Sequence, residues 1–302
     1  MLALGDGDEI SRELDRGVIA SFAGLVFELR GDPAACERAR RALDPPPCTA
    51  APKFAVRCVL ELSPSAADPK PARAAIAWRW EHGRGTVLTR ACRAEVWPTP
   101  RGFAARAEVG PVGGLPQLFA GLAALILHRH GGAILHAASV ELDAGVLAFI
   151  GPSGAGKSTA CRHVEGAPGF SIDRLAVMPG ETQDGDFGSR RTMWFAHPLT
   201  GGTPLPDMPA ATPRTLPLRG VFRIHQSPNG TRIEPASRAT AVAALRESSF
   251  QVGDGADAEL QLLERLERLA GGVPVARLHL TLGASLAAPL RRWLVDQAKE
   301  AG

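Results

Sequence analysis

The feature that most constrains this chain is a glycine-rich stretch at its centre. It reads Gly151-Pro152-Ser153-Gly154-Ala155-Gly156-Lys157-Ser158-Thr159 and fills the pattern G-x-x-x-x-G-K-[ST] at every fixed position. The unbroken apolar run before it, residues 146–150, predicts a strand buried on both faces. Residues 157–165 after it predict a helix that ends at Gly166. A strand, a glycine loop and a helix in this order are the context that a phosphate-binding loop (Walker A) requires.

The residue types of this stretch suit a phosphate for physical reasons. Glycines let consecutive backbone N–H groups turn towards one anion, and a helix N-terminus adds partial positive charge. Lys157 would reach the terminal phosphates, and the Ser158 hydroxyl would hold Mg²⁺. We therefore expect ATP or GTP to bind with Mg²⁺ at Gly151, Ser153, Gly154, Ala155, Gly156, Lys157, Ser158 and Thr159.

Phosphoryl transfer also needs a carboxylate that holds the metal or accepts the proton of an attacking hydroxyl. The later apolar runs, residues 216–224 and 275–282, contain no acid. Asp173 ends the short apolar run 169–173, at 173 − 151 = 22 positions after Gly151. A turn-forming aspartate is the alternative interpretation of this residue. Because no rival acid ends a later strand, we predict Asp173 as the metal-binding or general-base carboxylate.

The central part of the chain resembles the C-terminal domain of HPr kinase/phosphorylase and its HPr-kinase-like relatives. The resemblance covers about residues 131–285 and rests on three stretches. They are Leu135-His136-Ala137-Ala138-Ser139-Val140, with His136 at 151 − 136 = 15 positions before Gly151, the glycine-rich stretch itself, and Phe170-Ser171-Ile172-Asp173-Arg174. It implies an α/β P-loop domain of the HPr kinase/phosphoenolpyruvate carboxykinase type.

The resemblance also implies a role for His136, and it shows where this sequence departs from the family pattern. His136 would lie beside the phosphates, although a lone histidine next to an apolar strand is by itself more typical of a structural residue. The acid pair of the family is here Ile172-Asp173, so one carboxylate is missing. Possible substitutes are Glu181, Asp184 and Asp186. The arginine- and asparagine-containing stretch of true HPr kinases is absent from the sequence, which argues against HPr as the substrate.

Composition excludes several other classes. The formal net charge is +3 and the arginines are scattered, so neither nucleic acid nor an anionic membrane is an expected partner. The five cysteines are odd in number and form no C-x-x-C pair, which argues against disulfides and zinc. These cysteines are Cys36, Cys48, Cys58, Cys92 and Cys161, and they fit a reduced cytosol best, which predicts a cytoplasmic protein. The N-terminus has neither a basic region nor a long apolar core of the kind found in signal peptides.

Two domains are expected from the length of 302 residues and from the pattern of elements. Residues 1–112 read as a smaller β-rich α+β domain of unknown role, with strands at 25–29, 54–62, 75–80, 85–88 and 102–109. Residues 113–302 form the P-loop domain. There we expect a helix at 117–129, a strand at 133–142, a hairpin turn at 143–145, and a mobile polar loop at 179–192. Further strands are expected at 193–196, 216–224 and 275–282, and helices at 239–247, 256–269 and 286–298.

These observations predict a Mg²⁺-dependent kinase that transfers the γ-phosphate to a hydroxyl. The resemblance makes a serine of a peptide or small protein the expected acceptor, and a ribosomally made precursor peptide a plausible one. Lys157, Asp173 and His136 are the expected catalytic residues, and Ser158 and Asp173 the expected metal ligands. Two alternatives stay open: a nucleotide-binding regulatory module with little transfer activity, and an ATPase that needs no acceptor. The oligomeric state is left open.

Overall fold

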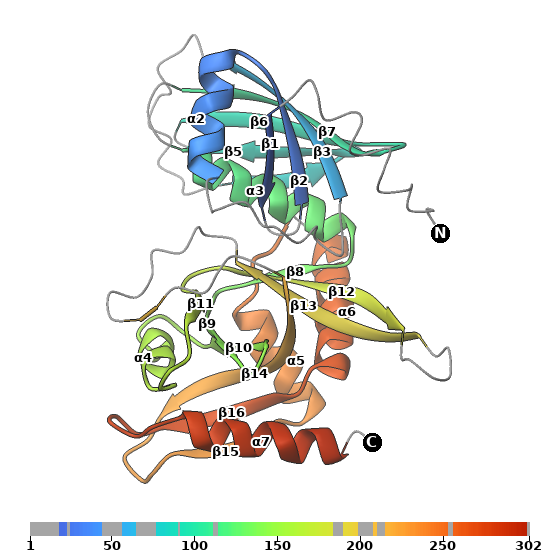
Figure 1. Ribbon diagram of the computed structural model, residues 1–302. Helices are drawn as coiled ribbons and strands as arrows, with labels where there is room; N and C mark the ends of the chain where they lie inside the picture. Colours follow the sequence, from blue (N-terminus) through green and yellow to red (C-terminus); the bar gives the residue numbers. More distant parts are fainter. Residues whose placement is uncertain are drawn as a thin grey trace. The chain divides into compact units, whose positions relative to one another are not determined.

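The computed structural model describes residues 18–22, 25–43, 56–64, 77–89, 91–110, 114–183, 190–198, 208–209, 215–252 and 256–300. The chain divides into two compact units, Met1–Leu122 and Ala123–Gly302 (Figure 1). The division falls inside helix α3 (Leu115–Arg129), whereas the boundary expected from the sequence precedes this helix. Within the described residues, no helix is both long and apolar enough to cross a bilayer.

In the described part of the first unit, seven strands form one sheet in the order β1-β2-β3-β7-β6-β5-β4. β2, β3 and β7 run parallel, and the remaining pairs are antiparallel. Helix α2 (Pro33–Leu43) makes the crossover from β2 to β3, and the Asp32 carboxylate caps it by accepting from the N–H of Ala35 at 2.7 Å. The strands are β1 (Val18–Phe22), β2 (Leu25–Gly31), β3 (Val56–Pro64), β4 (Ala77–Glu81), β5 (Arg84–Leu88), β6 (Cys92–Thr99) and β7 (Gly102–Val109).

In the described part of the second unit, nine strands form a curled sheet whose main path is β11-β9-β10-β14-β13-β12-β8, with β16 and β15 added beside β14. The strands are β8 (Ala133–Leu135), β9 (Ala137–Leu142), β10 (Gly145–Ile150), β11 (Gly169–Ser171), β12 (Leu175–Gln183), β13 (Arg190–Pro198), β14 (Leu216–Gln226), β15 (Arg232–Pro235) and β16 (Val275–Leu280). The helices after α3 are α4 (Lys157–Arg162), α5 (Arg238–Glu247), α6 (Ala256–Gly272) and α7 (Ala287–Glu300).

Strand β10 lies at the centre of this sheet and has both faces covered. Its six residues are all buried, as the apolar run predicts. Ala148 and Ile150 belong to the core shared with α5 and α6, and Phe149 belongs to the core shared with α4 and α7. β10 is antiparallel to β9 and parallel to β14. The strand before the glycine-rich stretch is therefore fixed from all sides.

A two-residue turn delivers the chain into β10. Leu142 pairs with Gly145, and the two residues between them, Asp143 and Ala144, have φ of 49° and 59°. Two consecutive positive φ values are the signature of a type I′ hairpin turn. The hairpin expected at 143–145 is confirmed.

Three sequence-based expectations were wrong. The strand expected at 133–142 is interrupted at His136, because β8 pairs with β12 whereas β9 pairs with β10 and β11. The mobile loop expected at 179–192 is largely the β12–β13 hairpin, in which Gln183 pairs with Arg190, and residues 184–189 lie outside the described residues. The helix expected at 157–165 ends at Arg162.

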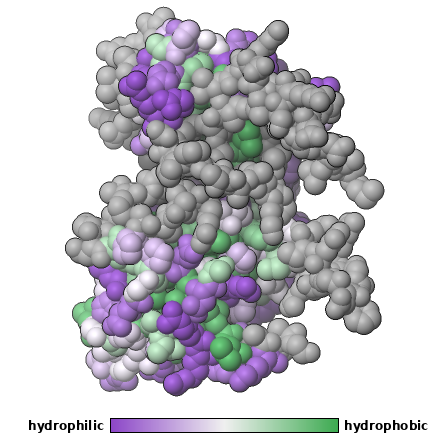
Figure 2. Space-filling view, viewed as in Figure 1, coloured by the Kyte–Doolittle hydropathy of each residue, from purple (hydrophilic) through white to green (hydrophobic). Residues whose placement is uncertain are grey.

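The surface of the described residues mixes polar and apolar side chains. On the face drawn in Figure 2, strongly hydrophilic residues alternate with small apolar patches. The large hydrophobic side chains that are exposed lie apart from one another in the sequence, at Leu88, Leu260, Leu282 and Val295. The four described cysteines are buried and free, and burial raises the pKa of the Cys58 and Cys161 thiols to about 12, as expected for small hydrophobes. Cys48 lies outside the described residues.

Candidate functional site

The glycine-rich stretch forms a tight loop between β10 and α4. Gly151, Gly154 and Gly156 have φ of 142°, 78° and 99°, which is backbone that side chains with a Cβ rarely adopt. Gly156 is also the N-cap of α4. Because α4 has only six residues, its dipole is small, and any anion bound here would depend mainly on the N–H groups of the loop. Gln226 at the end of β14 ties this loop to the sheet, since its Nε2 donates to the carbonyl of Gly154 at 3.3 Å.

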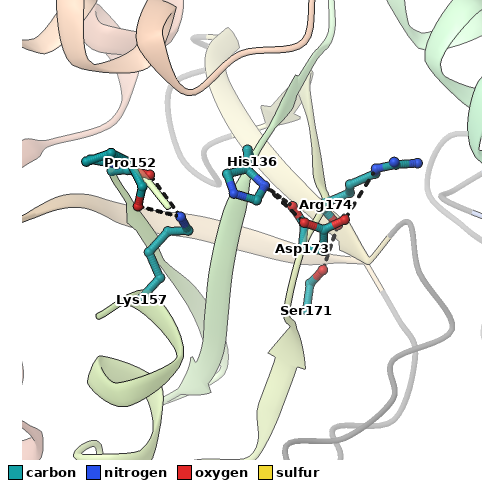
Figure 3. A network of polar contacts seen from close by, with 7 residues as sticks. His136, Pro152, Lys157, Ser171, Asp173 and Arg174 are labelled. Atoms are coloured by element: carbon teal, nitrogen blue, oxygen red, sulfur yellow. Dashed lines mark hydrogen bonds and ion pairs between the residues drawn. The ribbon is translucent and has the colours of Figure 1, made fainter. Parts of the chain in front are cut away.

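Lys157 folds back over the loop that precedes it (Figure 3). Its side chain is only 9% exposed, and its Nζ donates to the carbonyls of Gly151 at 2.9 Å and Pro152 at 3.1 Å. Burial lowers the pKa of Lys157, and the nearby carboxylate of Asp173 opposes this shift. A desolvated ammonium that donates to two neutral carbonyls is suited to an anion that brings negative charge.

His136 and Asp173 lie together because two paired stretches of strand are interrupted at matching positions in the sheet. His136 lies in the gap between β8 and β9, and Asp173 in the gap between β11 and β12. On one side of the gap Leu175 pairs with Leu135, and on the other side Ser171 pairs with Ser139. The Ser171 hydroxyl fixes the second break by donating to the carbonyl of Arg174 at 2.6 Å. The interruption that the sequence did not predict is thus what places the two side chains together.

The carboxylate of Asp173 has contacts on both oxygens (Figure 3). Its Oδ1 lies 3.0 Å from Nδ1 of His136, and its Oδ2 lies 3.5 Å from Nε of Arg174. Nδ1 of His136 is also 3.1 Å from the carbonyl oxygen of Asp173. Both oxygens can only accept, so Nδ1 carries a proton in this arrangement. The Asp173 side chain is 52% exposed, which leaves it accessible to a substrate.

A pocket of about 370 Å³ opens beside this pair. One wall is the segment after α5, which is held to the β8–β9 gap: the N–H of His136 donates to the carbonyl of Ser248 at 2.6 Å, and the N–H of Phe250 to that of Ile134 at 2.9 Å. The guanidinium of Arg174 lies 5.4 Å from the centre of the Phe250 ring, a cation–π distance. The lining residues are His136, Asp173, Arg174, Glu247, Ser248, Ser249 and Phe250.

The structure brings together only some of the residues singled out in the sequence. Lys157, His136 and Asp173 lie around the loop and the pocket, and Ser158 and Thr159 are half-buried at the start of α4. Ser153 is exposed at the tip of the loop. Of the substitute acids, Glu181 lies on β12 opposite Thr192, and Asp184 and Asp186 lie outside the described residues. Glu247 was not predicted, because it follows the motif by 247 − 157 = 90 residues and stands at the end of an ordinary helix.

The oxygen donors at the site fit Mg²⁺ better than a metal that needs a protein cage. Among the described residues, no three His, Cys, Asp or Glu side chains converge as a metal-binding group. Mg²⁺ usually keeps several waters and takes one or two carboxylates together with substrate phosphates. Ser158 directly follows Lys157 at the start of α4, and the Asp173 carboxylate lies near enough to act on the pKa of Lys157, so both remain candidate ligands of Mg²⁺.

No family model matches the chain, and a comparison with curated proteins gave no match. The geometry of the site is therefore the basis of the functional proposal. A glycine-rich loop before a helix, a desolvated lysine and an accessible carboxylate beside a pocket can bind a phosphorylated ligand and remove a proton from a neighbouring hydroxyl.

Proposed function

We propose that this chain is a kinase of the HPr-kinase-like type, which binds ATP or GTP with Mg²⁺ and transfers the γ-phosphate to a hydroxyl group. The observation that carries the proposal is that His136 and Asp173 line one pocket, while Lys157 lies near enough for the charge of Asp173 to act on its pKa. The α/β P-loop architecture expected from the resemblance is part of the same proposal. It is supported by the order of β10, the glycine loop and α4, and by the parallel neighbour β14.

Each residue has a role that follows from its position. Lys157 exchanges the carbonyls of Gly151 and Pro152 for phosphate oxygens and holds the charge of the terminal phosphates. Asp173 accepts the proton of the acceptor hydroxyl as that oxygen forms its bond to the γ-phosphorus, while the bond from this phosphorus to the bridging oxygen breaks and the nucleoside diphosphate leaves. His136 holds the Asp173 carboxylate in place through Nδ1–H. When bound, Mg²⁺ neutralises part of the phosphate charge, with Ser158 and Asp173 as its protein ligands.

The pocket is the site proposed for the acceptor. Its volume of about 370 Å³ suits one side chain, and its lining combines hydroxyls, charged groups and an aromatic ring. The acceptor proposed from the resemblance is a serine of a peptide or small protein in the cytoplasm, such as a ribosomally made precursor peptide.

One observation favours a second candidate, a nucleotide-binding module or ATPase without an acceptor. Ile172 stands where the resemblance implies a second acid, and its side chain packs against the core on the α4 face. The site then offers fewer carboxylates than a kinase of this type would use.

Two measurements separate these candidates. Calorimetric titration with Mg²⁺-ATP and Mg²⁺-GTP tests nucleotide binding, which both candidates require. Incubation with γ-labelled nucleotide and a peptide mixture then tests transfer. Label on a peptide supports the kinase, label only in inorganic phosphate supports the ATPase, and binding without turnover supports the regulatory module.

A further inference from the structure

A cationic side chain outside the motif lies at the same edge of the sheet as the phosphate loop. Arg223 is on β14, and its partner across the parallel pair is Ile150, the last residue before the loop. On the other side of β10, Ile150 pairs with Ala137, which directly follows His136. Arg223 and His136 therefore lie on opposite sides of β10, at the level where the loop begins.

Arg223 is tied to the pocket through one carboxylate. Its Nη2 lies 2.8 Å from Oε2 of Glu247, and Glu247 lines the pocket together with His136 and Asp173. The Arg223 side chain is 26% exposed, and that of Glu247 is 58% exposed. A partly exposed ion pair of this kind contributes little to stability. The guanidinium can therefore exchange the carboxylate for a stronger anion at small cost.

A second arginine lies beside Arg223. The partner of Arg223 on β16 is Arg277, and both arginines act on His225, whose pKa is lowered by burial first and by these charges and His279 in addition. Glu234 is the carboxylate that opposes this shift.

We propose that Arg223 is a phosphate-binding residue of the nucleotide site, and that its guanidinium moves from Glu247 to the terminal phosphate of a bound triphosphate. The planar guanidinium can donate two parallel hydrogen bonds to phosphate oxygens. This inference rests on the proposed function and deepens it, because it assigns the residue by which the site distinguishes a triphosphate from a diphosphate. Glu247, released from Arg223, then faces the pocket as a free carboxylate.

The test is equilibrium binding of a non-hydrolysable ATP analogue and of ADP, each with Mg²⁺, to the full chain. Arg223→Ala is expected to weaken binding of the triphosphate analogue by about tenfold or more, because at least one charge-assisted hydrogen bond is lost, and binding of ADP by less than about twofold. Arg223→Lys keeps the positive charge but cannot donate two parallel hydrogen bonds. Its affinity for the triphosphate analogue is expected to lie between those of wild type and Arg223→Ala. Arg219→Ala is the matched control, since Arg219 is exposed and lies nearer the start of β14.

Glu247→Gln separates a phosphate-binding role from a structural one. Removing the carboxylate charge frees Arg223, so the triphosphate is expected to bind as tightly as to wild type or more tightly. Equal weakening of both nucleotides by Arg223→Ala, or no weakening of either, would overturn the assignment while leaving the kinase proposal intact. Loss of triphosphate affinity in Glu247→Gln would also overturn it. A wild-type chain that binds neither nucleotide would remove the proposed function together with this inference.

Discussion

At the scale of single residues, Lys157 is the clearest case of a buried charge. Burying its ammonium group costs stability unless an anionic ligand binds to it. Lys157 is almost fully buried, its pKa is lowered by burial, and its hydrogen bonds go to two carbonyls of its own loop. A phosphate offers the same ammonium a full negative charge in place of two neutral acceptors. The energetic gain from this exchange is available only when the ligand is anionic.

Replacing Lys157 with Ala is expected to weaken Mg²⁺-ATP binding by about 100-fold or more, because hydrogen bonds to charged groups contribute roughly 1.5–3 kcal/mol each. The measurement is calorimetric titration of both proteins. Lys299→Ala is the control, since Lys299 is exposed near the end of α7. Unchanged affinity in Lys157→Ala would place the nucleotide elsewhere.

Some residues of the proposed site could be singled out from the sequence and others could not. The loop residues follow from the motif, and Asp173 follows from its position at the end of a short apolar run. His136 needed the resemblance, because one histidine beside a strand has no chemical signature of its own. Arg223 and Glu247 carry no sequence signal at all: they meet only because β14 runs parallel to β10 and α5 ends above it.

At the scale of elements, the glycine loop depends on backbone that other residues adopt only with strain. Gly156→Ala places a Cβ on a residue with φ of 99°, which costs about 1–2 kcal/mol, although no atom lies closer than 3.8 Å to that Cβ. We expect lower thermal stability and weaker nucleotide binding. Gly169→Ala is the matched control, because its φ lies outside the left-handed region and no atom lies within 4 Å of its Cβ. Equal behaviour of the two variants would argue against a strained loop.

In the turn of the β9–β10 hairpin, a substitution is expected to raise stability rather than lower it. Ala144 has φ of 59° in a type I′ turn, where glycine is favoured. Ala144→Gly is therefore expected to stabilise the protein by about 0.5–1 kcal/mol, seen as a rise of the thermal midpoint by about 2–4 °C. Ala144→Val is expected to lower the midpoint, since a β-branched residue tolerates positive φ least. A fall in both variants would contradict the turn geometry.

The predicted elements fail where tertiary pairing overrides local pattern. Residues 179–183 contain proline and glycine and read as a loop. They nevertheless extend β12, because residues 190–194 of β13 pair with them. Helix α2 (Pro-Ala-Ala-Cys-Glu-Arg-Ala-Arg-Arg-Ala-Leu) was missed although Ala35, Cys36 and Ala39 are buried at helical spacing, because these residues are small. The extension of β12, by contrast, is determined by its pairing with β13.

At the scale of the whole molecule, one buried histidine links stability to acid. His197 on β13 is 1% exposed, and burial lowers its pKa to about 4 from 6.5. Its Nδ1 lies 2.9 Å from Oγ1 of Thr215, and its Nε2 has no hydrogen-bond partner in the described part of the chain. Between about pH 4 and pH 6.5, His197 binds a proton in the unfolded chain but not in the folded chain. Stability is therefore complete above about pH 6.5 and is lost as the pH falls towards 4.

The expected loss from this single residue is about 3 kcal/mol across that range. His197→Leu removes the group, so urea unfolding measured at pH 7 and at pH 5 is expected to differ less in this variant than in wild type. His82→Asn is the control: His82 is exposed in a turn with φ of 48°, which asparagine tolerates. If His197→Leu kept the full acid sensitivity of wild type, the histidine would not be its source.

The proposed transfer of phosphate to a peptide is tested most directly by comparing wild type with Asp173→Asn. Both proteins are given γ-labelled ATP, Mg²⁺ and a mixture of cellular peptides, and nucleotide affinity is measured in parallel, with Asp296→Asn as the exposed control on α7. The account predicts labelled peptide in wild type, a decrease of about 100-fold or more in Asp173→Asn, and nucleotide affinities within a few-fold of each other. Tight nucleotide binding without label on any peptide in wild type, or equal transfer by Asp173→Asn, would contradict it.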